Sequence, residues 1–162
     1  MNSALIAEFK QESANTRKML ERVPQEHFDW KPHEKSMTLK RLALHVAEMT
    51  RWATITIKQD ELDFSADYPK TPPINHTEDI LSLFDQLKAE ALEALENVTD
   101  EELGRNWTLK NGSHVFFTLP KGAVLRSMVF NHIIHHRGQL SVYLRMNNVA
   151  VPGLYGPSAD EK

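Results

Sequence analysis

The sequence predicts an all-α protein: a four-helix bundle with a small β-hairpin between the third and the fourth helix. Four segments carry apolar residues at the spacing of an amphipathic helix, and one short stretch shows strand-like alternation. Helices of about 20 residues are near 30 Å long, a length typical of such bundles. The chain has 162 residues, 41% of them apolar, so we expect one domain over residues 1–162.

A loop that contains aromatic residues and prolines separates the first two helices. The first helix is expected over residues 3–22, and Pro24 ends it. The second is expected from about residues 36–39 to residue 58, with Ser36 or Thr38 as its N-cap. Its inward stripe places a histidine among apolar residues: Leu42, His45, Val46, Met49 and Ala53.

Two long connections lead to the third and fourth helices and make the bundle a non-minimal one. A proline-rich loop over residues 68–73 precedes the third helix, which is expected from Thr77, its N-cap, to about residue 98. Residues 107–119 are expected to form the hairpin around a Lys-Asn-Gly-Ser turn. The fourth helix is expected over residues 122–146.

Three histidines are the most informative residues of the chain: His45, His132 and His136. The last two lie four residues apart, so a helix places them one above the other on the same face. All three fall on stripes where an amphipathic helix carries apolar residues. Three convergent imidazoles suit a divalent transition metal, and three protein ligands leave a coordination position for chemistry.

Other interpretations of these histidines exist. A single core-facing histidine is usually a hydrogen-bonded core residue, and two at this spacing can form a solvated pair at the end of a bundle. Three on two apolar stripes are harder to explain without a metal, because each would need burial and a partner. His135 is not expected to be a ligand, since it lies about 100° around the helix from His136. The other four are expected in solvent: His27, His33, His76 and His114.

Further residues near the histidines are candidates with two interpretations each. Glu48 is either a hydrogen-bond acceptor or proton carrier for the site, or a solvated carboxylate. Arg137 is either a clamp for an anionic substrate or the partner of a surface carboxylate. Gly138 in mid-helix costs up to about 1 kcal/mol relative to alanine, which suggests the close approach of another helix or chain. Three residues either wall a pocket or pack in the core: Trp30, Trp52 and Trp107.

Composition and charge argue against several classes of function. The net charge is −3 and the 19 basic residues are scattered, so no nucleic-acid partner is expected. The apolar runs are too short to span a bilayer and the start of the chain is unlike a secretory signal, so we expect no membrane partner and a cytoplasmic location. Without cysteine the chain offers no disulfide, thiolate ligand or cysteine nucleophile.

Three segments together resemble the DinB/YfiT-like family: residues 30–39, 42–48 and 131–140, the last with a His-x-x-x-His-Arg-Gly-Gln element. The tail over residues 151–161 is similar as well, so the resemblance covers essentially the whole chain. It implies an up-down-down-up four-helix bundle with nickel or zinc bound by His45, His132 and His136. It also implies kinship with transferases and isomerases that use low-molecular-weight thiols such as bacillithiol or mycothiol, and with proteins that form homodimers.

Two classes of function are compatible with these observations. In the first, the protein is an enzyme whose metal favours the thiolate form of a thiol co-substrate, which then attacks an electrophilic small molecule. Hydroxide derived from water on the same metal would instead make a hydrolase. In the second, the protein is a non-catalytic metal-binding or stress-response module. A fourth protein ligand would favour the module, and the sequence offers no obvious one.

Overall fold

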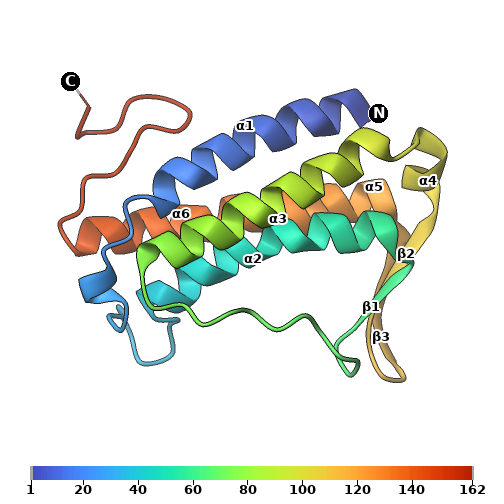
Figure 1. Ribbon diagram of the computed structural model, residues 1–162, viewed down its shortest axis with the longest axis horizontal. Coiled ribbons are helices and arrows are strands. Elements are labelled where there is room, and N and C mark those ends of the chain that lie inside the picture. Colours follow the sequence, from blue (N-terminus) through green and yellow to red (C-terminus); the bar gives the residue numbers. More distant parts are fainter. Residues whose placement is uncertain (1, 162) are drawn as a thin grey trace.

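Helices dominate the fold, as predicted. The structure is a computed structural model that describes residues 2–161. Four long helices lie side by side (Figure 1): α1 (Asn2–Leu20), α2 (Leu39–Lys58), α3 (Thr77–Asn97) and α6 (Asn131–Met146). Four shorter pieces complete the helical part: η1 (Gln25–His27), α4 (Asp100–Gly104), α5 (Lys121–Val124) and the π-helical turn η2 (Leu125–Phe130). The predicted fourth helix is therefore the run of α5, η2 and α6.

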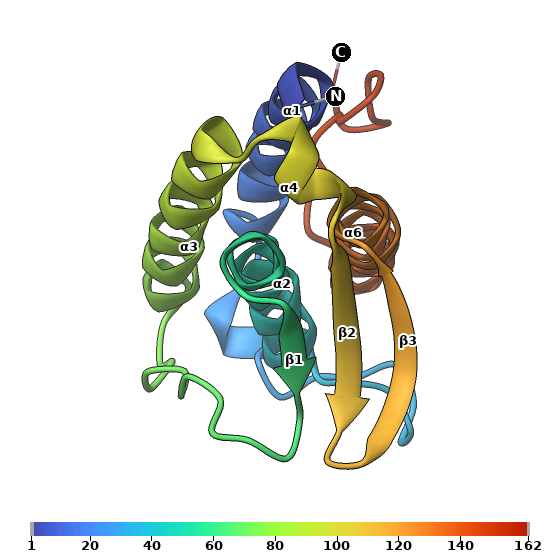
Figure 2. The ribbon, with the colours of Figure 1, turned by 90° about the vertical axis from the view of Figure 1, so that its right-hand side faces the viewer.

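The helix α2 occupies the middle of the arrangement. In Figure 2, α3 and α6 lie on opposite sides of α2, which packs against both, and α1 packs against α3 and α6. Two clusters of buried apolar side chains follow one another along these helices, one around Phe9 and Phe130 and one around Leu42 and Phe84. The N-terminal part of α2, with Leu42, thus packs in one cluster and its C-terminal part, with Ala53, packs in the other.

The N-termini of α2 and α3 show one correct prediction and one wrong one. Thr38 caps α2, because its hydroxyl accepts a hydrogen bond from the backbone N–H of Arg41 at 3.2 Å. The N-cap of α3 is His76 rather than Thr77. The reason is Asp79, whose carboxylate accepts the backbone N–H of His76 at 2.8 Å and so begins the helix one residue earlier. The hydroxyl of Thr77 instead donates to the carbonyl of Val23 at 2.8 Å.

The predicted hairpin is part of a larger sheet, which corrects the all-α prediction. Strands β2 (Asn106–Asn111) and β3 (His114–Pro120) are antiparallel, and Gly112 turns between them with a φ of 58°. A third strand, β1 (Glu61–Asp63), pairs with β2 in parallel, giving the order β1-β2-β3. The sequence did not predict β1, because a strand of three residues is too short to show an alternating pattern.

The sheet covers a third cluster of buried apolar side chains, and this cluster settles the role of one tryptophan. Trp107 on β2 is fully buried and packs with Ile55, Leu109 and Val124, so it is a core residue. The other two tryptophans are partly buried. The ring of Trp30 meets that of Tyr143 at 5.4 Å between centroids, while Trp52 and Phe64 are 6.0 Å apart.

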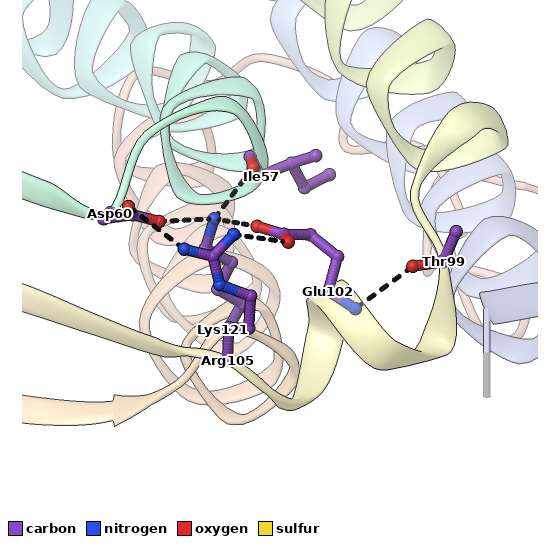
Figure 3. Close-up of polar contacts among 6 residues, drawn as sticks. All are labelled: Ile57, Asp60, Thr99, Glu102, Arg105 and Lys121. Carbon is purple, nitrogen blue, oxygen red and sulfur yellow. Dashed lines mark hydrogen bonds and ion pairs between the residues drawn. The ribbon is translucent and has the colours of Figure 1, made fainter.

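A buried lysine joins the sheet to the end of α2 (Figure 3). Lys121 is 1% exposed, and its ammonium donates to the carbonyl of Ile57 at 3.0 Å and to Glu102 at 2.5 Å. Asp60 lies 3.2 Å away as a second carboxylate. A carbonyl and two carboxylates therefore surround the ammonium, which compensates its charge in the buried position. None of the helices in the described part of the chain combines the length and the apolar character needed to cross a membrane.

Candidate metal centre

The three predicted histidines meet between α2 and α6. His45 lies in the first half of α2, and His132 and His136 lie in the first half of α6. One nitrogen of each ring belongs to a group whose members all lie within 4.8 Å of one another. The centroid of the His45 ring lies 5.3 Å from that of the His132 ring and 4.5 Å from that of the His136 ring. Each side chain is half-buried, so the centre is sheltered but open to a ligand.

The donor set fits a divalent metal. A tetrahedral ion with bonds of about 2.0–2.1 Å separates its nitrogen ligands by roughly 3.3 Å. The Nε2 atoms of His132 and His136 are 2.8 Å apart, and the whole group spans no more than 4.8 Å. Small rotations of the rings would bring the three nitrogens to the required spacing. No carboxylate joins this group within residues 2–161.

Two neighbours orient the rings so that lone pairs point at the centre. Oε1 of Gln139 lies 2.7 Å from Nδ1 of His136, and it accepts a hydrogen bond when Nδ1 carries the proton. The amide of Gln139 then donates to Nε2 of His135 at 3.1 Å, which fixes the orientation of the amide. The ring of His132 donates to the backbone carbonyl of Met128. Hydrogen bonds of this kind set the tautomer of a histidine and make the other nitrogen a better ligand.

The pKa values of the histidines favour the neutral form. Burial lowers the pKa of His45 from 6.5 to about 4, with His136, Arg41 and His132 adding to the effect. Burial also lowers the pKa of His132 and of His136. Only a neutral imidazole can bind a metal, so the site remains competent at pH 7 and below. The range in which protonation would compete with a metal therefore lies below the ordinary pKa of 6.5.

Neither of the two catalytic candidates, Arg137 and Glu48, belongs to the group of three histidines, and each has other partners. Arg137 is 1% exposed and pairs with Glu12 at 2.6 Å, and it donates to the hydroxyl of Thr16 at 3.1 Å. Its guanidinium also contacts the hydroxyl of Tyr155. These bonds join α6 to α1 and the C-terminal tail. Glu48 accepts from Arg41 at 3.2 Å and from the hydroxyl of Thr71, which lies in the loop before α3.

The remaining histidines lie where their positions in the sequence suggest. His135 is exposed, and although its ring lies edge-on to that of His136 with 4.8 Å between centroids, it is not one of the three grouped residues. Four histidines are exposed, as predicted: His27, His33, His76 and His114. Sequence reasoning missed Gln139. The signal was present, because residues three apart on a helix are neighbours and Gln139 follows His136 by three.

Fold and site together define a mainly helical protein with a three-histidine group of the kind that holds a divalent metal. The chain belongs to the DinB family, which it matches over residues 1–162. Two similar proteins of Bacillus subtilis strain 168 are the uncharacterized proteins YjoA and YrdA. YjoA is 26% identical over 153 residues, which cover 93% of this chain and 94% of YjoA. YrdA is 26% identical over 151 residues, which cover 93% of this chain and 85% of YrdA.

Two crystal structures show the same fold. A DinB-like protein from Bacillus subtilis, YjoA, matches with a TM-score of 0.72 at 20% identity, over 98% of this chain and 99% of that protein. A DinB-like protein from Bacillus cereus ATCC 10987 matches with a TM-score of 0.71 at 24% identity, over 94% and 97%. At these identities the match concerns the fold, and the chemistry of the site has to be argued from its own residues.

Proposed function

We propose that this protein is a metal-dependent enzyme that transfers a low-molecular-weight thiol to an electrophilic small molecule. One observation carries the proposal: three imidazole nitrogens converge in a half-buried position, and no other metal-binding side chain joins them within residues 2–161. Three protein ligands with a remaining coordination position are typical of catalytic sites, whereas structural sites are closed by four. Nickel and zinc are the proposed metals, since imidazole suits both.

The residues of the chain would bind the metal, and the thiol co-substrate would supply the nucleophile. Gln139 and the carbonyl of Met128 would hold protons on the outer sides of His136 and His132, so that their other nitrogens would be free to bind an ion. A bound divalent metal acts as a Lewis acid and favours the anionic, nucleophilic form of a thiol at neutral pH. The chain contains no cysteine. The attacking sulfur must therefore belong to the co-substrate, and it forms a bond to carbon as the leaving group departs.

A cavity beside the centre offers space for the substrate. It has a volume of about 400 Å³, and Gln139 forms part of its wall together with Met37 and Tyr143. Gln139 also contacts His136, so the cavity begins one side chain away from the histidine group. Lys35 lies at the same cavity and would favour an acidic group on the ligand. The volume suits a small molecule with an apolar body.

An assay of electrophile consumption tests this function. Purified protein, loaded with nickel or zinc or treated with a chelator, is mixed with an electrophile such as 1-chloro-2,4-dinitrobenzene, with and without a set of small thiols. The proposal expects turnover only when both metal and thiol are present. Turnover that needs the metal but ignores the thiol would assign the protein as a hydrolase. Absence of turnover with every thiol, together with tightly bound metal, would favour a non-catalytic metal-binding module.

We further propose that the protein is a homodimer that uses the outer face of α6. Gly138, Val142 and Met146 follow one another at four-residue intervals, and the latter two are 56% and 55% exposed. A Cβ at Gly138 would meet nothing within 4 Å outside its own helix backbone in residues 2–161, so packing within the described fold does not explain the glycine. The close approach of a second copy of the chain to this stripe would explain it.

Light scattering should give the mass of a dimer for the wild type and that of a monomer for Val142→Glu. Val115→Glu, on the exposed strand β3, should leave the dimer intact. A monomeric wild-type protein would contradict the proposal.

The up-down-down-up order of the helices also belongs to this proposal. The course of the chain in Figure 1 supports it, because α1 and α6 run in one direction and α2 and α3 in the other. This order would place α2 and α6 antiparallel to each other.

A further inference from the structure

Three cationic side chains are buried within residues 2–161, and one of them differs from the other two. Arg137 pairs with Glu12, and Lys121 pairs with Glu102 and Asp60. Arg51 on α2 is 9% exposed, yet no carboxylate forms an ion pair with it within residues 2–161. A buried positive charge without a counterion is costly, so the third cation needs an explanation.

The partners of Arg51 in the protein are neutral. Its guanidinium donates to the carbonyl of Pro69 at 3.0 Å. It also lies over the ring of Tyr68, with 5.7 Å between the guanidinium carbon and the ring centre. Burial raises the pKa of Tyr68, which keeps this hydroxyl uncharged near neutral pH. These contacts fix the arginine in place and leave its charge uncompensated.

Arg51 lines a cavity of about 370 Å³ between α2 and α3, beneath the loop that follows β1. This cavity is separate from the histidine group, which lies on the side of α2 that faces α6. Two carboxylates also line the cavity, that of Asp67 on the loop and that of Glu90 on α3. A ligand with only negative charge would meet these two acids, and a ligand with only positive charge would meet Arg51.

The lining also contains an unused hydroxyl. Oγ1 of Thr54 is buried, and it has no hydrogen-bond partner within the described chain. Thr56, on the same helix, has a buried unpartnered hydroxyl too, but it does not line this cavity. Buried hydroxyls are normally satisfied, so a ligand that reaches Thr54 would recover a hydrogen bond.

We propose that this cavity binds a small zwitterion of the α-amino acid class, with its carboxylate on Arg51, its ammonium toward Asp67 and Glu90, and a hydrogen bond to Thr54. The site is independent of the metal centre. The carboxylate supplies the missing counterion through charge-assisted hydrogen bonds, which are among the stronger polar contacts in proteins. A volume of this size suits a molecule of a few to about twenty non-hydrogen atoms.

Titration of the full-length protein tests the proposal. The standard amino acids are added one at a time at millimolar concentration, with propionate and propylamine as probes that carry only one of the two charges. Binding is followed by calorimetry and by the Nε–Hε signal of Arg51 in nuclear magnetic resonance spectra. At least one amino acid should shift this signal in a saturable way, and both single-charge probes should bind about tenfold more weakly or worse. Absence of a shift with every amino acid, or equal binding of propionate, would overturn the proposal.

Two matched variants separate binding from folding. Thr54→Val should weaken the best amino acid about three- to tenfold by removing one hydrogen bond, while Thr56→Val should leave its affinity unchanged. Equal affinities of the two variants would contradict the assigned contact. Arg51→Gln and Glu90→Gln should each abolish saturable binding, and unchanged affinity in either would refute the arrangement of charges. Metal content is measured in parallel and should stay the same in all four variants, so failure here would leave the metal centre untouched.

Discussion

Two polar regions of α6 begin at neighbouring residues and are built in opposite ways. His136 faces His45 on α2, and its Nε2 atom lies 2.8 Å from that of His132. Arg137 faces α1, where Glu12 balances its charge. Around Arg137 both terminal nitrogens of the guanidinium donate to acceptors, which is what stability requires of a buried charge. In the histidine region the lone pairs converge on a shared point, which is what a metal requires. The comparison teaches that satisfaction of polar groups, more than burial or charge, separates a structural region from a functional one.

The largest effect on stability is expected from breaking the arginine region. Arg137→Met leaves the carboxylate of Glu12 buried without its counterion, so the free energy of unfolding in urea should fall by about 3–5 kcal/mol. Arg126, an exposed partner of Glu8, is the matched control. Arg126→Met should cost less than about 1 kcal/mol. Similar losses for the two variants would mean that the buried pair has no special role in stability.

The histidine region should respond in metal content instead. His45→Ala, His132→Ala and His136→Ala should each lose the bound metal, because two imidazoles hold a divalent ion far less tightly than three. His135→Ala should retain it, since His135 is outside the group. Elemental analysis by mass spectrometry measures the metal, and circular dichroism confirms that the fold is intact. Wild-type metal levels in the His132 and His136 variants would refute the site.

A smaller effect on metal binding is expected from Gln139, which contacts His136 and is not itself a ligand. Gln139→Leu removes the acceptor that orients His136, so metal affinity should fall about 10- to 100-fold. Gln139→Glu keeps an acceptor oxygen and should lie closer to the wild type. Ser141→Ala removes a hydrogen bond on the same helix away from the histidines and serves as the control. Competition with a chelator of known affinity gives the constants, and an unchanged value for Gln139→Leu would exclude the orienting role.

The smallest effect concerns the pH dependence of the metal-free protein. His45 has its pKa lowered to about 4 by folding, so the unfolded chain takes up the proton first as the pH falls. The stability that this histidine contributes is therefore present above pH 6.5 and is lost as the pH falls toward 4. The loss should be about 1–2 kcal/mol once solvent screening of the half-buried ring is allowed for. Urea unfolding at a series of pH values should show this slope, and His45→Gln should flatten it.

The long helices and the histidine group could be predicted from the sequence because both depend on periodicity. Apolar spacing located α1, α2, α3 and the α5–η2–α6 run, and the four-residue spacing of His132 and His136 placed them on one face. The inferred pairing of His45 with them came from its position on an inward stripe. Patterns within one segment carry such information, since the helix itself sets the geometry.

Features that depend on contacts between distant segments were not predictable in this way. β1 exists because Glu61, Leu62 and Asp63 pair with β2, more than 40 residues later. Asp63 strengthens this junction by accepting the backbone N–H of Gly112 at 2.8 Å and that of Ser65 at 2.9 Å, bonds that lower its pKa to about 2. The buried ion pair of Arg137 likewise joins residues 125 positions apart. No local pattern in the sequence predicts the pairing of β1 with β2 or that of Arg137 with Glu12.

The π-helical turn η2 sets the direction in which the side chains of α6 point at the metal centre. A π-helical turn holds about one residue more than an α-helical turn, so it rotates everything after it relative to everything before. Val124 before the turn is buried against α2 and the sheet, while His132 and His136 after it face α2. A deletion of a single residue within Leu125–Phe130 would give a smoother helix with better backbone geometry. It would also swing the two ligands by about 100°, away from His45. The less regular helix is therefore the one that keeps the three nitrogens together.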